Sequence, residues 1–215
     1  MSEYYSSRGL VLRSEPWRDG DRLATVLTRD YGLLRLQIKS GLKVGHKLAG
    51  HLEPLTLTDI TWARTRYGDT VIEASSVESF PALKSSLDAL APLLWGTRVL
   101  EKISPIEQPA QPLYALALER WWLTKNHSAD LLKIRTLANA FLWQLLALEG
   151  LAPDISNLTT ALPSAANCNP NALKTIRLFL NQPLNFWANK KIATRWLEPA
   201  ESLLRSFIQF HLPSY

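Results

Sequence analysis

Apolar and polar residues alternate with a period of two near the start of the chain. Leu34, Leu36 and Ile38 alternate with polar and basic residues. Because successive side chains of a strand point to opposite faces, this alternation predicts a strand with one buried and one solvated face. Four more strand-like segments, bounded by turn-forming residues, lie at 8–13, 22–28, 55–67 and 70–75. The first 80 residues therefore favour an all-β domain.

The pattern changes to a helical period near residue 80. Leu83, Leu87, Leu90 and Leu94 recur at steps of three and four residues, which places them on one side of a helix. Beyond a proline-rich break, further helices are predicted at about 113–125, 128–150, 170–180 and 199–211. Ser128 is the expected cap of the second of these. Residues 151–169 are rich in Pro, Ala, Ser, Thr and Asn and predict an irregular loop.

Five short strands, with a longer insertion between the third and the fourth, are typical of an OB-type barrel. Closing the sheet into a barrel also leaves few exposed strand edges. We therefore predict an α+β fold, with an N-terminal five-stranded OB-fold β-barrel at 1–80 and an all-α helical domain at 81–215. An SH3-like barrel is the alternative on the strand pattern alone.

Composition and charge narrow the class of protein. The chain has 215 residues, of which 47% are hydrophobic, and it carries a net charge of +5. This excess of basic residues favours an anionic partner such as nucleic acid or an acidic protein tail. A single cysteine, Cys168, excludes an internal disulfide and a multi-cysteine zinc site. With no signal-like N-terminus and no run of about 20 apolar residues, we expect a cytoplasmic protein without a membrane span.

Motifs of enzyme chemistry are absent from the sequence. It contains no phosphate-binding glycine loop, nucleophile elbow or zinc-protease motif. His46 and His51 have no carboxylate or cysteine at a spacing that would complete a metal site. We therefore predict no catalytic residue, no metal and no cofactor, and a protein that binds rather than makes bonds.

The fourth predicted strand carries a candidate nucleic-acid surface. Alternation places Trp62, Arg64 and Arg66 on one face. If that face is exposed, the indole offers a stacking platform for bases and the arginines offer contacts to phosphates. The alternative is that Trp62 packs in the barrel or against the helical domain while the arginines are only solvated.

Two further groups of basic residues are candidates for binding. Lys39, Lys43 and Lys47 recur at four-residue steps, so a helical turn would align them as a ridge for phosphates, although a solvated face is equally compatible with the spacing. Arg35 adds a basic residue to the face of the third strand. A C-terminal cluster that suits an acidic tail or DNA, or a solvated face, consists of Lys174, Arg177, Lys190, Lys191 and Arg195.

An ordered series of short motifs resembles the RecO family of bacterial recombination mediators. The series is Gly9-Leu-Val-Leu-Arg13, Glu15-Pro-Trp17, Asp21-Arg22, Leu27-Thr28, Tyr31-Gly32-Leu33, Lys39, Leu48-Ala-Gly50 and Leu52-Glu-Pro54. Later segments, Ser79-Phe-Pro-Ala-Leu83 and Leu148-Glu-Gly-Leu-Ala-Pro153, resemble that family as well. The likeness is strong over about residues 1–100, patchy to 155 and weak beyond.

The resemblance implies a protein that binds single- and double-stranded DNA and anneals complementary strands. It also implies engagement of the acidic C-terminal tail of single-stranded-DNA-binding protein and, together with RecR, assistance in loading RecA. Lys39 matches a lysine of the family, and Lys43 and Lys47 fall where basic residues are common. These three are therefore the leading candidates for DNA contact, while Arg35, Arg64 and Arg66 rest on strand alternation alone.

Two departures from the family pattern modify this expectation. Many members carry a four-cysteine zinc module where this chain has only Cys168, so no zinc is expected and the loop 151–169 stands in its place. Ser40 and Leu42 stand where glycine and arginine are usual, which should weaken the contact with DNA. A protein-interaction adaptor with weak or no DNA binding, and an RNA-binding OB protein, are the alternative functions.

Overall fold

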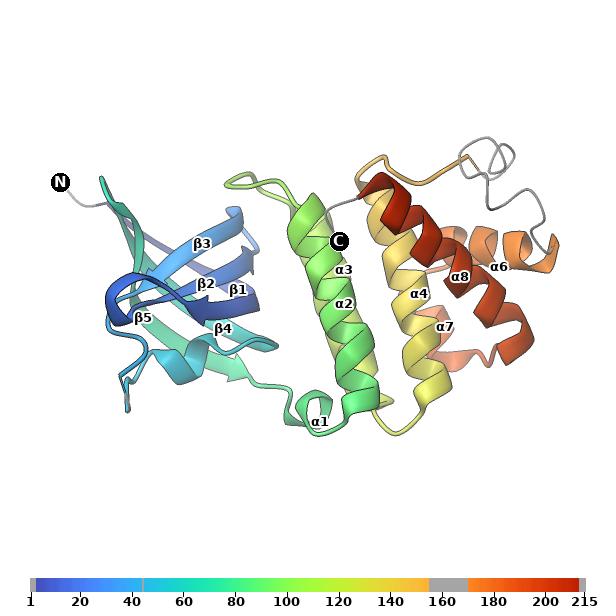
Figure 1. Ribbon diagram of the computed structural model, residues 1–215, viewed down its shortest axis with the longest axis horizontal. Coiled ribbons are helices and arrows are strands. Elements are labelled where there is room, and N and C mark those ends of the chain that lie inside the picture. The colour runs from blue at the N-terminus through green and yellow to red at the C-terminus, as the bar shows by residue number, and fades with distance from the viewer. Residues whose placement is uncertain (1–2, 44, 155–169, 213–215) are drawn as a thin grey trace. The chain divides into compact units, whose positions relative to one another are not determined.

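The computed structural model describes residues 3–43, 45–154 and 170–212, and it has the predicted α+β class. Strands come first and helices follow (Figure 1). The strands are β1 (Glu3–Pro16), β2 (Arg22–Thr28), β3 (Gly32–Ile38), β4 (Thr56–Thr65) and β5 (Gly68–Glu78). All five predicted strands are present. β1 and β5 extend well beyond their predicted ends because β4 pairs with β1 from Glu3 onwards and with β5 from Gly68 to Glu78.

The strands close into a barrel in the order β1-β2-β3-β5-β4. The long β1 pairs antiparallel with β2 through its second half and with β4 through its first, and a parallel contact between Gln37 and Thr70 closes the ring. This is the OB-fold, so the predicted barrel type is confirmed. The closed order leaves the connection between β3 and β4, residues 39–55, as the long insertion of the barrel.

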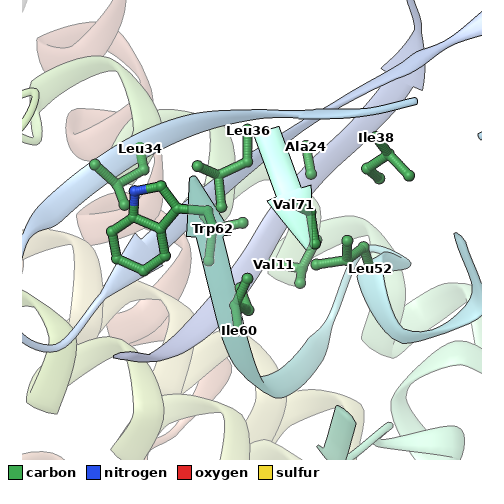
Figure 2. Close-up of a cluster of buried hydrophobic side chains, with 10 residues drawn as sticks. Val11, Ala24, Leu34, Leu36, Ile38, Leu52, Ile60, Trp62 and Val71 are labelled. Atoms are coloured by element: carbon green, nitrogen blue, oxygen red, sulfur yellow. The ribbon is translucent and has the colours of Figure 1, made fainter. Parts of the chain in front are cut away.

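Ten apolar side chains fill the barrel, and Figure 2 shows their arrangement around Trp62. The cluster contains Val11, Ala24, Val26, Leu34, Leu36, Ile38, Leu52, Ile60, Trp62 and Val71. The indole of Trp62 lies beside Leu34 (Figure 2) and stacks on the ring of Tyr5 at 5.7 Å. Period two along β3 and β4 therefore directs the larger side chains into the interior.

The outer face of β1, of β2 and of the first residues of β3 is also buried. Leu27 and Leu33 are sequence neighbours of core residues and so point away from the barrel interior, yet each is at most 2% exposed. Residues 97–118 form one compact unit with the barrel, and an ion pair of 2.8 Å joins Arg13 to Glu101. Helical residues of the same chain thus pack on part of the face formed by strands 2 and 3, which many OB-folds use for binding.

Residues 105–108 extend the barrel sheet beside the first residues of β3. The Leu33 amide donates to the Pro105 carbonyl at 3.3 Å, and the Glu107 amide donates to the Leu33 carbonyl at 3.0 Å. Gly32 has a φ of +72°, and a Cβ at this position would lie 1.8 Å from the Gln108 carbonyl oxygen. The close approach of the two backbones therefore requires a glycine.

Seven α-helices lie within the described residues. They are α1 (Pro81–Lys84), α2 (Leu87–Ile103), α3 (Gln111–Asn126), α4 (Leu131–Leu148), α6 (Pro170–Asn181), α7 (Leu184–Asn189) and α8 (Thr194–His211). The expected cap at Ser128 is wrong, because Asp130 accepts a hydrogen bond from the Lys133 amide at the start of α4. The short α7 was not predicted, and α8 begins five residues earlier than predicted and contains Pro199.

The second compact unit comprises residues 86–96 and 119 onwards. Its central helix α4 contacts α6, α7 and α8. This helix is long and apolar enough to cross a membrane, but 67% of it is buried inside the protein, as expected for a core helix. The two units divide within α2 and α3, so independent folding of residues 1–80 and 81–215 stays a prediction. Of the predicted loop 151–169, residues 155–169 lie outside the described part.

Candidate functional site

The insertion after β3 carries the three candidate lysines on a series of turns. The amides of Gly41, Lys43 and His46 donate to the carbonyls three residues earlier, without a continuous helix. Ser40 has a φ of +54°, a left-handed conformation that interrupts helical propagation. The predicted helical alignment of these lysines is therefore wrong. Lys39, Lys43 and Lys47 are nonetheless all exposed, and none has an ion-pair partner in the part of the chain that the structure describes.

The β1–β2 loop holds this insertion in place. The Leu42 amide donates to the Gly20 carbonyl at 3.0 Å, and the Ser40 amide donates to the Asp21 carboxylate at 2.6 Å. The same loop exposes Trp17, whose ring lies 5.5 Å from the guanidinium of Arg18. Three exposed lysines, an arginine and an accessible indole are thus carried by two loops that are hydrogen-bonded to each other.

Arg35 is the exposed basic residue on β3, as the alternation predicted. It shares its strand face with Gln37, and the next residue of that alternation, Lys39, follows directly after the strand. No ion pair engages Arg35 among the residues that the structure describes. The basic positions at 35 and 39 therefore continue one side of the barrel into the insertion.

The two arginines predicted on β4 differ in their surroundings. Arg64 is paired with Asp69 at 3.0 Å and with Glu107 at 3.2 Å, and the hydrogen bond with Asp69 raises its pKa. Its charge is largely neutralised within the protein. Arg66 lies in the β4–β5 turn, exposed, with its guanidinium 4.6 Å from the ring of Tyr67. Only Arg66 of this pair is available for a phosphate.

Trp62 does not offer a stacking platform, since it is 1% exposed and belongs to the barrel core. A stacking role would have required Trp62 to lie on an exposed face, and it does not. The alternative, that Trp62 packs in the barrel, is correct. Two accessible aromatic rings lie in the loops of the barrel: Tyr67 is 79% exposed and Trp17 is 43% exposed. The sequence carries a signal for both: each aromatic residue adjoins an arginine in the β1–β2 or β4–β5 loop, which bind oligonucleotides in other OB-folds.

The C-terminal basic cluster borders an apolar groove of about 410 Å³ in the second unit. Lys174, Lys190 and Lys191 line it together with Leu178, Phe186, Trp187, Ile192 and Trp196. The ammonium group of the buried Lys133 donates to the Trp187 carbonyl at 3.0 Å and to the Lys190 carbonyl, which fixes the end of α7. Arg177 and Arg195 are exposed but do not line the groove. Three of the five predicted residues therefore come together.

Across residues 3–43, 45–154 and 170–212 there is no cluster of three or more His, Cys, Asp or Glu side chains that could hold a metal ion. The prediction that concerns Cys168 lies outside the described residues.

Comparison with known proteins finds a family similarity over the barrel residues. Residues 1–80 match the family model described as "Recombination protein O N terminal". The DNA repair protein RecO of Gloeothece citriformis is 29% identical over 155 residues, 72% of this chain and 54% of that protein. RecO of Pelotomaculum thermopropionicum is 25% identical over 233 residues, 97% of this chain and 89% of that protein. The match with the first of these relatives thus spans about half of its length.

Proposed function

We propose that this chain is a member of the RecO family, that it binds single- and double-stranded DNA and that it anneals complementary strands. The match of residues 1–80 to the N-terminal family model and the similarity to RecO proteins support this proposal. As a DNA repair and recombination mediator it works with RecR to help load RecA onto DNA coated with single-stranded-DNA-binding protein. It acts in the cytoplasm, by binding rather than by catalysing a reaction.

The exposed lysines of the β3–β4 insertion carry the DNA part of this proposal. Lys39, Lys43 and Lys47 project from a segment that is hydrogen-bonded to the β1–β2 loop, and no acidic side chain of the described residues pairs with them. Cations of this kind bind phosphates by releasing counterions, which gives affinity without sequence preference. Trp17 and Tyr67 supply ring faces on which unpaired bases can stack, each worth about 1–3 kcal/mol.

The groove between α6, α7 and the start of α8 supports binding of the acidic tail of single-stranded-DNA-binding protein. Three lysines at its margin attract carboxylates, while Phe186 and Trp187 offer an apolar floor. An extended peptide with acidic and apolar side chains matches both features. The tail would recruit the protein to coated DNA, and the barrel would then contact the DNA itself.

Annealing of complementary oligonucleotides coated with the cognate single-stranded-DNA-binding protein tests the proposed function. We expect the wild-type chain to accelerate annealing at 50 mM salt and to lose most of this effect at 200 mM. Replacing Lys39, Lys43 and Lys47 together with alanine should lower the salt dependence of DNA affinity by about 0.7 per lost phosphate contact on single strands.

The salt slope separates the proposal from the alternative functions. An adaptor without DNA binding would give identical DNA retention for the wild type and the triple variant, and the neutralised Arg64 and the covered outer face of β2 and β3 favour that alternative. An RNA-binding protein would prefer RNA in a direct competition with DNA of the same sequence. Either result would contradict the proposed function.

Charge reversal tests the groove independently of the barrel. Changing Lys190 and Lys191 to glutamate should weaken binding of the labelled acidic tail peptide at least about tenfold, because two attractive charges become repulsive at a partly desolvated site. Fluorescence anisotropy measures the affinity. Changing Arg177 and Arg195 to glutamate alters the net charge equally but lies outside the groove lining, so peptide affinity should change much less. Equal losses in both variants would leave the groove without a specific role.

A further inference from the structure

A small pocket of about 300 Å³ lies beside Arg35, within the barrel unit. β3 contributes Leu33 and Arg35, and the end of α2 contributes Arg98 and Lys102. Three cationic side chains thus line one small pocket, although they come from segments more than 60 residues apart in the sequence.

The charge of this pocket is not balanced by its own lining. Its one carboxylate, Glu101, already accepts a hydrogen bond and ion pair of 2.8 Å from Arg13. Arg35 and Arg98 are exposed, and neither has an ion-pair partner among the residues that the structure describes. The apolar side chain of Leu33, 2% exposed, forms part of the wall and reduces solvent screening. Two guanidinium groups without an ion-pair partner among the described residues therefore line this pocket.

A buried hydroxyl in the same lining lacks a hydrogen-bond partner. Ser104 is 6% exposed, and its Oγ has no partner within the described part of the chain. Leaving a buried hydroxyl unsatisfied is costly, and a bound ion is one of the explanations for such a group in a native protein. An anionic oxygen would accept a hydrogen bond from this hydroxyl and would lie among the three cations.

We propose that this pocket binds a phosphodiester group of DNA and so extends the DNA path from the insertion onto α2. The inference rests on the proposed DNA binding and deepens it. Because Leu27 and Leu33 are buried on the outer face of β2 and β3, and residues 97–118 belong to the same compact unit, DNA would follow the exposed margin of that face. Arg35 stands at that margin, with Arg98 on one side and Lys39 further along its own face.

The position of Lys102 has a simpler explanation by itself, but the pocket as a whole does not. Lys102 lies in the last turn of α2, where a lysine interacts favourably with the partial negative charge at the C-terminal end of the helix. That effect does not account for Arg35, which comes from a strand, or for the unpartnered hydroxyl of Ser104. Binding of one phosphate accounts for all of these features together.

The affinity of the full chain for a fluorescein-labelled oligothymidylate, measured by anisotropy between 50 and 200 mM NaCl, tests the pocket. The double variant Arg98→Gln/Lys102→Gln should lower the slope of log affinity against log salt by about 0.7, the share of one phosphate on a single strand. Arg177→Gln/Arg195→Gln removes the same charge from the other unit and should leave the slope unchanged. Ser104→Ala should lower affinity at every salt concentration without changing the slope, because a neutral hydroxyl releases no counterion.

The outcomes separate failure of the pocket from failure of the proposed function. If the wild type does not bind the oligonucleotide at 50 mM NaCl, DNA binding fails and the pocket fails with it. If Lys39, Lys43 and Lys47 alter the slope but Arg98→Gln/Lys102→Gln does not, only the pocket assignment is overturned. A pocket variant that binds DNA normally but loses the acidic tail peptide would assign the pocket to a peptide carboxylate and would also overturn the proposal.

Discussion

Replacing Gly32 with alanine should destabilise the barrel unit by at least about 3 kcal/mol and abolish DNA binding under ordinary conditions. The new Cβ would lie 1.8 Å from the Gln108 carbonyl oxygen and 2.7 Å from its carbonyl carbon. A backbone group cannot rotate away as a flexible side chain can, so residues 105–108 must separate from β3. Chemical denaturation followed by tryptophan fluorescence measures the loss, since Trp62 lies in the barrel core.

Gly20→Ala is the matched control for this substitution. Gly20 also has a positive φ, +85°, but a Cβ there would meet nothing within 4 Å. The substitution should therefore lower the free energy of unfolding by only about 1 kcal/mol, the strain of an alanine in a left-handed backbone conformation. If both variants lose the same stability, the close contact with Gln108 contributes nothing, and the attachment of residues 105–108 to the barrel would be unsupported.

This attachment also explains why the barrel unit could be predicted only in part. Alternation in the third strand, and short apolar segments bounded by turn-forming residues elsewhere, located all five strands. The same period could not say which face of β4 is inside, and so left Trp62 as a candidate for stacking. Nor does a local pattern reveal that residues 97–118 bury Leu27 and Leu33 from the other side, since that contact joins segments far apart in the chain.

The sequence predicted some features of the candidate sites and not others, again because contacts between distant segments leave no local pattern. The exposure of Lys39, Lys43 and Lys47 follows from their polar surroundings in the sequence, whereas their arrangement depends on the left-handed Ser40. That Lys174 shares a groove with Lys190 depends on how α6 and the end of α7 pack, which no spacing encodes. Charge locates candidate residues, while tertiary packing decides which of them act together.

A buried arginine in the second unit leads to the other large prediction. Arg120 on α3 is 1% exposed, and its Nη2 donates to the Pro92 carbonyl at 2.6 Å. The guanidinium lies 4.4 Å from the ring of Phe141, but Nε and Nη1 have no partner among the described residues. Burial lowers the pKa of Arg120 to about 9, so the group is still charged at neutral pH without a carboxylate to balance it.

Replacing Arg120 with methionine should therefore raise the free energy of unfolding by about 1–3 kcal/mol at pH 7, because an apolar side chain of similar length avoids the desolvation cost. The guanidinium has a higher pKa in the unfolded chain than in the folded one, so the unfolded state binds more protons at pH values between the two. The wild type should accordingly gain stability as the pH rises above 9, and the difference between the proteins should shrink. Urea unfolding followed by circular dichroism measures both effects.

Arg135→Met is the control, because this arginine pairs with the partly buried Glu201 at 2.7 Å. Removing it leaves a carboxylate with one partner fewer, so the helical unit should lose stability rather than gain it. If Arg120→Met is also destabilising by more than about 1 kcal/mol, the contacts with Pro92 and Phe141 outweigh the desolvation of the guanidinium, and the predicted sign is wrong.

Gly96 provides a second, coupled test of the same site. A Cβ at this position would lie 1.9 Å from Arg120 Nη1, and the buried guanidinium has no solvent into which it can move. Gly96→Ala alone should therefore cost about 3 kcal/mol, near the upper end for overpacking. In the Arg120→Met background the same change should cost less than about 1 kcal/mol, since the flexible thioether can yield. Additive effects in this double-mutant cycle would mean that Gly96 is required for a reason other than the arginine that it faces.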